Sequence, residues 1–177
     1  MSKPGDVIEN PRIGARVVFL RTGQETGGQL LETDLFVKPG GKAPPKHTHP
    51  NQDEYFRVIA GTITTWISGK ESILSAGEEC TAPKGTLHTW WNGGKSEAHV
   101  RVEFRPALRG DLALEAIYAL FRDRVRNPLQ WAVTFWEFRE EGGFPSVLVK
   151  IVIAGLAGIG RLLGYKPNYP YRKDQSA

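Results

Sequence analysis

Short β-rich segments separated by turn residues fill the chain from about residue 14 to residue 106. The segments lie at residues 17–20, 30–37, 55–60, 62–67 and 98–104. In the second of them, apolar or small side chains alternate with Glu32 and Asp34, as in a strand with one buried face. Gly, Pro, Asn and Ser cluster between the segments. Many short strands without intervening helical patterns predict an antiparallel β-sandwich or barrel.

Charge divides the chain into two parts. Residues 1–104 carry 12 basic and 12 acidic side chains, whereas residues 105–177 carry 11 basic and 7 acidic ones and supply the whole net charge of +4. The hydrophobic pattern also changes from strand to helix after Pro106. We therefore predict a barrel with N-terminal strands in residues 1–106 and a helical extension in residues 107–177. No segment reads as a nucleic-acid-binding module, so no nucleic-acid partner is expected.

Cysteine content and the first residues bear on the location of the protein. The single cysteine, Cys80, excludes an intrachain disulfide and a Cys-rich zinc module, and we expect it to pack in the barrel. Residues 1–5 contain no apolar run, so the sequence predicts no signal peptide and a cytoplasmic location.

Three of the four histidines and one glutamate suggest a metal site. His47 and His49 are separated by one residue, so on a strand both project from the same face. Glu54 opens the next strand, and His88 follows a Pro-x-Gly turn. Three imidazoles and a carboxylate would suit one divalent transition metal, namely Fe, Mn, Ni, Co or Zn. By spacing alone, histidines without a metal are an equal alternative.

Two longer motifs add a resemblance to a known family. The first has its fixed positions at Gly41, His47, His49, Glu54 and Gly61, and the second at Gly77, Pro83, Gly85, His88 and Asn92. Both match the two motifs of the cupins at every fixed position, so the chain resembles a single-domain cupin with a helical C-terminal extension. The resemblance implies a mainly β fold, the double-stranded β-helix or jelly-roll barrel, followed by C-terminal α-helices. It also implies a metal bound by His47, His49, Glu54 and His88, and a homodimer.

Strand parity predicts which side chains line a cavity beside the metal. If Glu54 points inward, Phe56 and Val58 do so too. In the same way, Trp90 points inward if His88 does. Trp66, on an opposite strand, is a further candidate lining residue. The register of that strand is open, so either Thr64 and Trp66 or else Thr65 points inward. An aromatic cavity would suit a planar or terpenoid-like apolar substrate. The alternative is that these side chains are barrel core.

The C-terminal part predicts three helices. They cover residues 111–125, a segment from Pro128 through Trp136, and residues 147–164, with Gly142 and Gly143 before the third. Lys150 and Arg161 leave only ten uncharged residues between them, too few for a membrane span. We expect the helices to cover one barrel mouth or to join two subunits. Interfacial membrane association through residues 144–164 is the less favoured alternative. Residues 165–171 should run extended along a surface.

These features predict a metal-dependent enzyme that acts on a small apolar or aromatic metabolite. A dioxygenase is the first choice, and the cupin resemblance implies that Glu54 can act as a base. An isomerase, cyclase or lyase using the same metal is the second choice. A non-catalytic cupin that binds a small molecule, or whose metal is structural, is the third.

Overall fold

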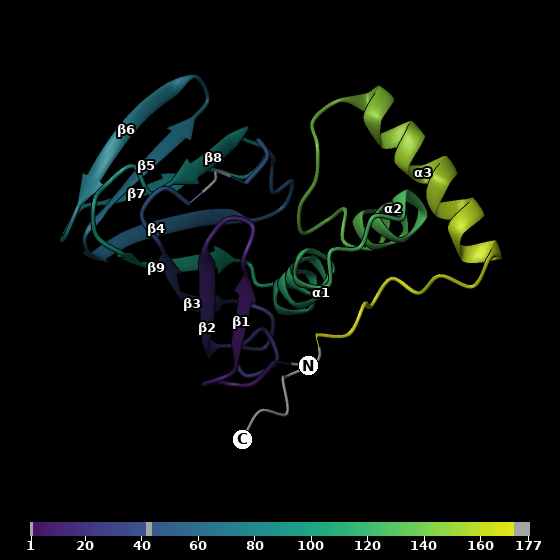
Figure 1. The fold of residues 1–177 in the computed structure, drawn as a ribbon, viewed down its shortest axis with the longest axis horizontal. Helices are drawn as coiled ribbons and strands as arrows, with labels where there is room; N and C mark the ends of the chain where they lie inside the picture. The colour runs from purple at the N-terminus through teal and green to yellow at the C-terminus, as the bar shows by residue number, and fades with distance from the viewer. Residues whose placement is uncertain (1, 42–43, 172–177) are drawn as a thin grey trace.

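The computed structural model describes residues 2–41 and 44–171, in which strands come first and helices last (Figure 1). The strands are β1 (Val7–Asn10), β2 (Ala15–Arg21), β3 (Leu31–Val37), β4 (Asp53–Ala60), β5 (Thr62–Ile67), β6 (Lys70–Ser75), β7 (Glu79–Ala82), β8 (His88–Trp91) and β9 (Ala98–Arg105). The helices are α1 (Gly110–Arg122), α2 (Pro128–Glu137) and α3 (Val147–Leu162). Of the predicted extension, residues 172–177 lie outside the described part.

Two antiparallel sheets form the barrel. One has the strand order β1-β2-β3-β9-β4-β7 and the other has the order β6-β5-β8. Large buried apolar side chains fill the core between the two sheets, among them Phe19, Leu31, Phe56 and Ile63. The predicted mainly β barrel followed by C-terminal helices is confirmed.

Alternating burial explains why the central strands were readable from sequence. In β3, Leu31 and Leu35 are buried while Glu32 and Asp34 lie on the outer face. On that face Arg101 of β9 donates to Glu32 Oε1 at 2.7 Å and to Asp34 Oδ1 at 2.8 Å. The sequence did not reveal β1 or β6. Both are edge strands, and an edge strand needs fewer apolar residues because one of its sides has no neighbour.

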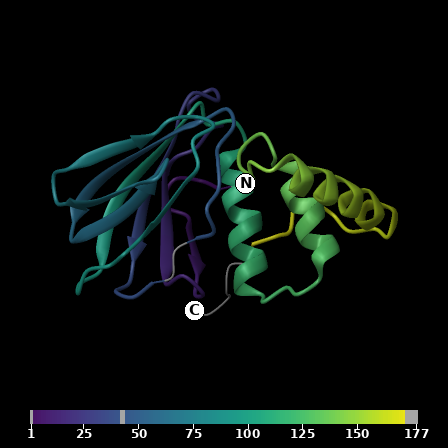
Figure 2. The ribbon, with the colours of Figure 1, turned by 90° about the horizontal axis from the view of Figure 1, so that it is seen from above.

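The helices are stacked outward from the barrel. α1 packs against β1, α2 packs on α1, and α3 packs on α2, so that α3 is the outermost element (Figure 2). Asn127 caps α2 by accepting from the Leu129 amide at 2.9 Å, and Pro128 takes the first helical position. None of the helices in residues 2–41 and 44–171 is long and apolar enough to cross a membrane.

Residues 165–171 return from α3 to the barrel. Gln130 Nε2 donates to the Lys166 carbonyl at 2.8 Å, and Thr134 Oγ1 donates to the Pro167 carbonyl at 3.1 Å. Further along, the Glu9 amide of β1 donates to the Tyr171 hydroxyl at 2.9 Å. This extended segment therefore ties the helices to the first strand.

Candidate metal centre and its cavity

The four residues singled out by the motifs come together at one end of the barrel. One ligand atom from each of His47, His49, Glu54 and His88 lies within 4.8 Å of the corresponding atoms of the others. The backbones of His47 and His88 pair through two hydrogen bonds of 3.0 Å, which place the first histidine segment beside β8. Glu54 reaches the same point from the start of β4.

Each of the three imidazoles is oriented by a backbone carbonyl. His47 Nδ1 lies 2.9 Å from the Pro45 oxygen, His88 Nδ1 lies 2.8 Å from the Thr86 oxygen, and His49 Nδ1 bonds to the Glu141 oxygen. A carbonyl can only accept, so each Nδ1 carries the proton and donates it. The Nε2 atoms are thereby left as the ligand atoms, an arrangement typical of metal-binding histidines.

The contact between His49 and Glu54 indicates whether the cluster fits a metal. His49 Nε2 is buried and has no hydrogen-bond partner among the described residues. It lies 3.2 Å from Glu54 Oε2. With the proton of His49 on Nδ1, these two atoms are both acceptors, and a cation between them removes the conflict. The donor set therefore fits a divalent transition metal, without identifying which one.

The charge states of the site follow from burial and mutual contact. Burial alone would raise the pKa of Glu54, but its contacts with His49 and His88 outweigh burial and lower that pKa. Burial, with the neighbouring His49 and His88, lowers the pKa of His47 to about 3. Glu54 is thus ionised and His47 neutral near neutral pH, as metal ligation requires.

His88 responds in the opposite direction. Burial would lower its pKa, but the hydrogen bond between His88 Nε2 and Glu54 Oε2, at 2.7 Å, and the charge of that carboxylate raise it. The pair therefore favours a shared proton, which an incoming cation has to displace.

Turns hold the ligand segments in place. The Gly85 amide donates to the His49 carbonyl at 2.8 Å, and the Thr86 amide donates to the Pro83 carbonyl at 3.0 Å, so the Pro-x-Gly turn sits against one histidine and delivers the next. Asn92 has a structural role in the turn that follows β8. Its Oδ1 accepts from the Gly94 amide, and its Nδ2 donates to the carbonyls of Val37 and Ser96, each at 2.8 Å.

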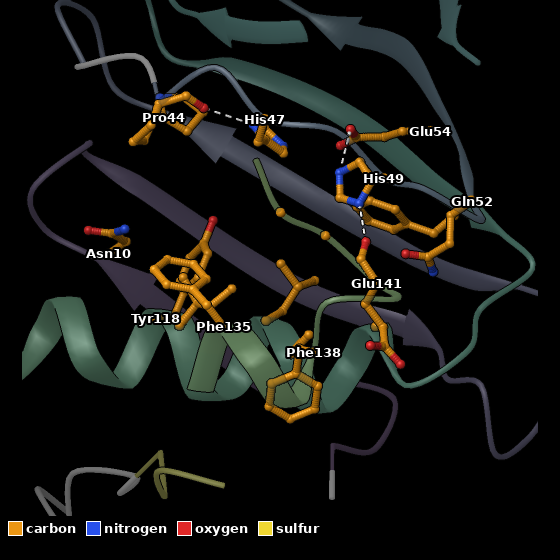
Figure 3. Close-up of a pocket in the computed structure, with 18 of the residues that line it drawn as sticks. Asn10, Pro44, His47, His49, Gln52, Glu54, Tyr118, Phe135, Phe138 and Glu141 are labelled. Atoms are coloured by element: carbon orange, nitrogen blue, oxygen red, sulfur yellow. Dashed lines mark hydrogen bonds and ion pairs between the residues drawn. The ribbon is translucent and has the colours of Figure 1, made fainter. Parts of the chain in front are cut away.

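A cavity of about 190 Å³ lies beside the ligand cluster (Figure 3). One wall is the barrel mouth with its histidines, and the opposite wall is a stripe of α1 with helical spacing that includes Ala113, Ile117 and Phe121. Phe135 and Phe138 add aromatic surface from α2 and the residue after it. Most of the lining is therefore apolar, and much of it comes from the C-terminal helices.

The segment after α2 is attached directly to the segment that carries His47 and His49. Thr48 and Gly143 exchange two backbone hydrogen bonds of 2.9 Å, and the Glu141 carbonyl accepts from His49. Arg109 holds the Glu141 carboxylate, because its Nε donates to Oε1 at 3.1 Å. Sequence reasoning treated Gly142 and Gly143 only as a break between helices. No spacing or motif signals a contact across more than 90 residues.

Of the four predicted lining residues, the structure places one at the cavity. Trp90 lines it, whereas Phe56 and Val58 share the inward orientation of Glu54 but lie in the barrel core. Trp66 does not line it either, and Lys46 Nζ lies 3.4 Å from the centre of its ring. Parity identifies the inward face of a strand, but only the residues near the mouth reach the cavity.

Cys80 and the fourth histidine of the chain, His99, lie away from the cavity. Cys80 packs against the barrel core, and burial raises the pKa of its thiol. His99 stacks on Phe36 with ring centres 4.3 Å apart, and its Nε2 is 3.0 Å from Asp34 Oδ1, on the outer face of the sheet.

Comparisons with known proteins agree with this fold. The family model for the cupin domain matches residues 35–104. Germin-like protein 1 of Brassica napus is 34% identical over 121 residues, which cover 66% of this chain and 54% of the relative. An oxidoreductase of Arthrobotrys oligospora is 46% identical over 56 residues, covering 31% of this chain and 22% of the relative. The chain thus spans about half the length, or less, of these curated relatives.

A solved structure shows the same fold. A Thermotoga maritima protein, described as a predicted oxalate decarboxylase, superposes with a TM-score of 0.50 at 16% identity, covering 56% of this chain and 97% of that one. The matched region ends at Phe104, so it contains all four ligand residues and none of the helices that complete the cavity. Residues 35–104 thus form a cupin domain, and the helical segment that follows it covers the candidate metal site.

Proposed function

We propose that this protein is a metal-dependent enzyme that acts on a small, largely apolar molecule, with dioxygenase activity as the first choice. The observation that carries the proposal is that the four-residue cluster borders a mostly apolar cavity through His47, His49 and Glu54. A structural metal site needs no such space beside it, whereas a catalytic one does.

The residues of the chain prepare this site in three ways. His47 and His49 present Nε2 lone pairs in orientations fixed by carbonyls, and His88 does so once it releases the proton that it shares with Glu54. Aromatic side chains exclude water and bind an apolar body. A bound divalent metal would supply Lewis-acid stabilisation of negative charge on substrate oxygen or on dioxygen.

A proton-transfer reaction, as in an isomerase, cyclase or lyase, is the second candidate. Glu54 favours it, because its Oε2 is 2.7 Å from His88 Nε2 and the pair can hold a proton at the edge of the cavity. The name of the Arthrobotrys relative, an oxidoreductase, supports the first candidate instead.

Metal analysis followed by an oxygen-uptake screen tests the proposal. The purified full chain is analysed for transition metals by mass spectrometry, depleted, and reloaded with Fe, Mn, Ni, Co or Zn in turn. Oxygen consumption is then recorded with a panel of small aromatic and terpenoid compounds, with His88→Ala as the metal-deficient control. Uptake by the reloaded wild type alone supports a dioxygenase.

Other results separate the remaining candidates. Substrate conversion without oxygen uptake supports the isomerase or lyase reaction. A chain that binds no transition metal under any loading condition refutes a metal-dependent enzyme of either kind.

A further inference from the structure

Tyr118 brings a hydroxyl group from α1 into the cavity. The side chain is only 6% exposed and lines the cavity, and Figure 3 shows its oxygen pointing away from α1 toward the barrel. Its hydroxyl has no hydrogen-bond partner among the described residues. Buried hydroxyls are almost always bonded, so this one is available to a molecule in the cavity.

Asn10 of β1 provides a second group of the same kind. It is 2% exposed and also lines the cavity. Its Oδ1 accepts from the Arg12 amide at 3.1 Å, which fixes the orientation of the side chain. Its Nδ2 has no partner in the part of the chain that the structure describes. β1 and α1 pack together, so the two elements that carry these donors are neighbours.

The charges around the cavity decide which acceptor these donors suit. No Lys or Arg is among the described residues that line it, whereas two carboxylate residues, Glu54 and Glu141, are. Burial, and then the charge of Glu54, raise the pKa of Tyr118, so its hydroxyl stays protonated and donates. No basic side chain of the described lining would neutralise an anion on this side of the cavity, and a neutral oxygen acceptor fits two neutral donors.

We propose that Tyr118 and Asn10 bind a neutral carbonyl oxygen of the substrate, whose apolar body lies against the aromatic wall formed by Phe135 and Phe138. The inference rests on the proposed function and narrows its substrate class to neutral apolar ketones, aldehydes and related carbonyl compounds. It also gives the helical extension a direct role in selecting the substrate.

A pair of isosteric probes tests this contact. Acetophenone carries a carbonyl oxygen where α-methylstyrene carries a CH₂ group, and the two have nearly the same shape. Binding of each is measured by ligand-observed NMR titration to the full chain, both as purified and after dialysis against EDTA. Tyr118→Phe should weaken acetophenone binding about 10-fold and change α-methylstyrene binding by less than about 2-fold.

Two further variants keep the test specific. Asn10→Asp retains an acceptor for the Arg12 amide but replaces the donor, so it should also weaken acetophenone binding selectively. Tyr55→Phe is the matched control, because the Tyr55 hydroxyl donates to Glu79 on the outer face of the barrel. It should bind both probes like the wild type.

The outcomes separate this inference from the proposed function. Three results would each overturn the carbonyl contact. Tyr118→Phe could weaken binding of both probes equally or leave binding of both unchanged, or the wild type could fail to bind acetophenone. Selective loss in a chain that takes up no metal would leave the contact standing and refute the metal-dependent enzyme.

Discussion

His49 donates its Nδ1 proton to the backbone carbonyl of Glu141, a residue that lies 92 positions later in the chain. The first belongs to the cupin motif, and the second follows the second helix of the extension. The orientation of a candidate metal ligand in the barrel is thus set by the helical segment. The extension is therefore part of the candidate site as well as a cover over it.

Removal of one ligand should abolish most metal binding. His88→Ala leaves two imidazoles and Glu54, and we expect metal affinity to fall more than about 100-fold, because even residues that only orient ligands contribute 10- to 100-fold. Metal stoichiometry after gel filtration measures the loss. His99→Ala, on the outer face, is the control and should keep the wild-type stoichiometry. Full retention by His88→Ala would rule out the four-ligand site.

Releasing the loop that orients His49 should lower metal affinity less than removing a ligand does. Glu141→Ala removes the carboxylate held by Arg109 but leaves the backbone carbonyl in place, so we expect about a 10-fold loss of metal affinity. Competition with a chromophoric chelator measures it. The adjacent Glu140 bonds to Asn51 at the surface, and Glu140→Ala should bind metal normally. Equal affinities for the two variants would show that the clamp does not orient His49.

The four ligand residues could be predicted because they depend on short-range order. A spacing of one residue, a strand start and a Pro-x-Gly turn each act locally, so His47, Glu54 and His88 could be identified from sequence. Tyr118 and Glu141 could not, since they reach the cavity only through the packing of helices on the barrel. Covering of a barrel mouth was one of two alternatives expected for the helices, because periodicity does not encode where a helix docks.

Close packing between α2 and α3 should make two neighbouring glycines respond oppositely to alanine. A Cβ at Gly160 would lie 2.6 Å from Val133 Cγ2, whereas a Cβ at Gly158 would meet nothing within 4 Å. We expect Gly160→Ala to destabilise the protein by about 1–3 kcal/mol. Gly158→Ala should stabilise it by up to about 1 kcal/mol, because alanine favours the helix. Urea unfolding followed by circular dichroism distinguishes them, and equal shifts would contradict this packing.

Asp34, on the outer face of the large sheet, should contribute to stability in a pH-dependent way. Burial alone would raise the pKa of Asp34, but hydrogen bonds and charge from Arg101 and His99 outweigh it and lower that pKa below 3.8. A lowered folded-state pKa means that this contribution is present above about pH 4 and is lost as the pH falls through the folded-state value.

Substitution of Asp34 isolates this contribution. Asp34→Asn should lower the free energy of unfolding by about 1–2 kcal/mol at pH 7, and the difference from wild type should shrink toward pH 2. Urea unfolding at several pH values measures the trend. Glu71→Gln on the exposed edge strand β6 is the control and should change stability by less than about 0.5 kcal/mol. A difference that stays constant with pH would contradict the assigned ion pair.

The apolar outer face of α3 leads us to expect pairing of two copies of the chain. Leu148 is 69% exposed and Leu162 is 89% exposed, and contiguous apolar surface of this kind marks interaction sites. Sedimentation velocity should show a dimer. The double substitution Leu148→Glu with Ile151→Glu should yield monomers. Ile73→Glu, at an exposed apolar position on β6, should not. A monomeric wild type would contradict the expectation.

The late position of Glu141 has a consequence for how the protein matures on the ribosome. Synthesis runs from the N-terminus, so all four ligand residues emerge before the segment that orients His49. A nascent barrel can therefore fold with its ligands present but with one imidazole still free to rotate. The final geometry of the centre is reached only when the helices dock. Full preorganisation of the candidate site therefore requires the helical segment as well as the barrel.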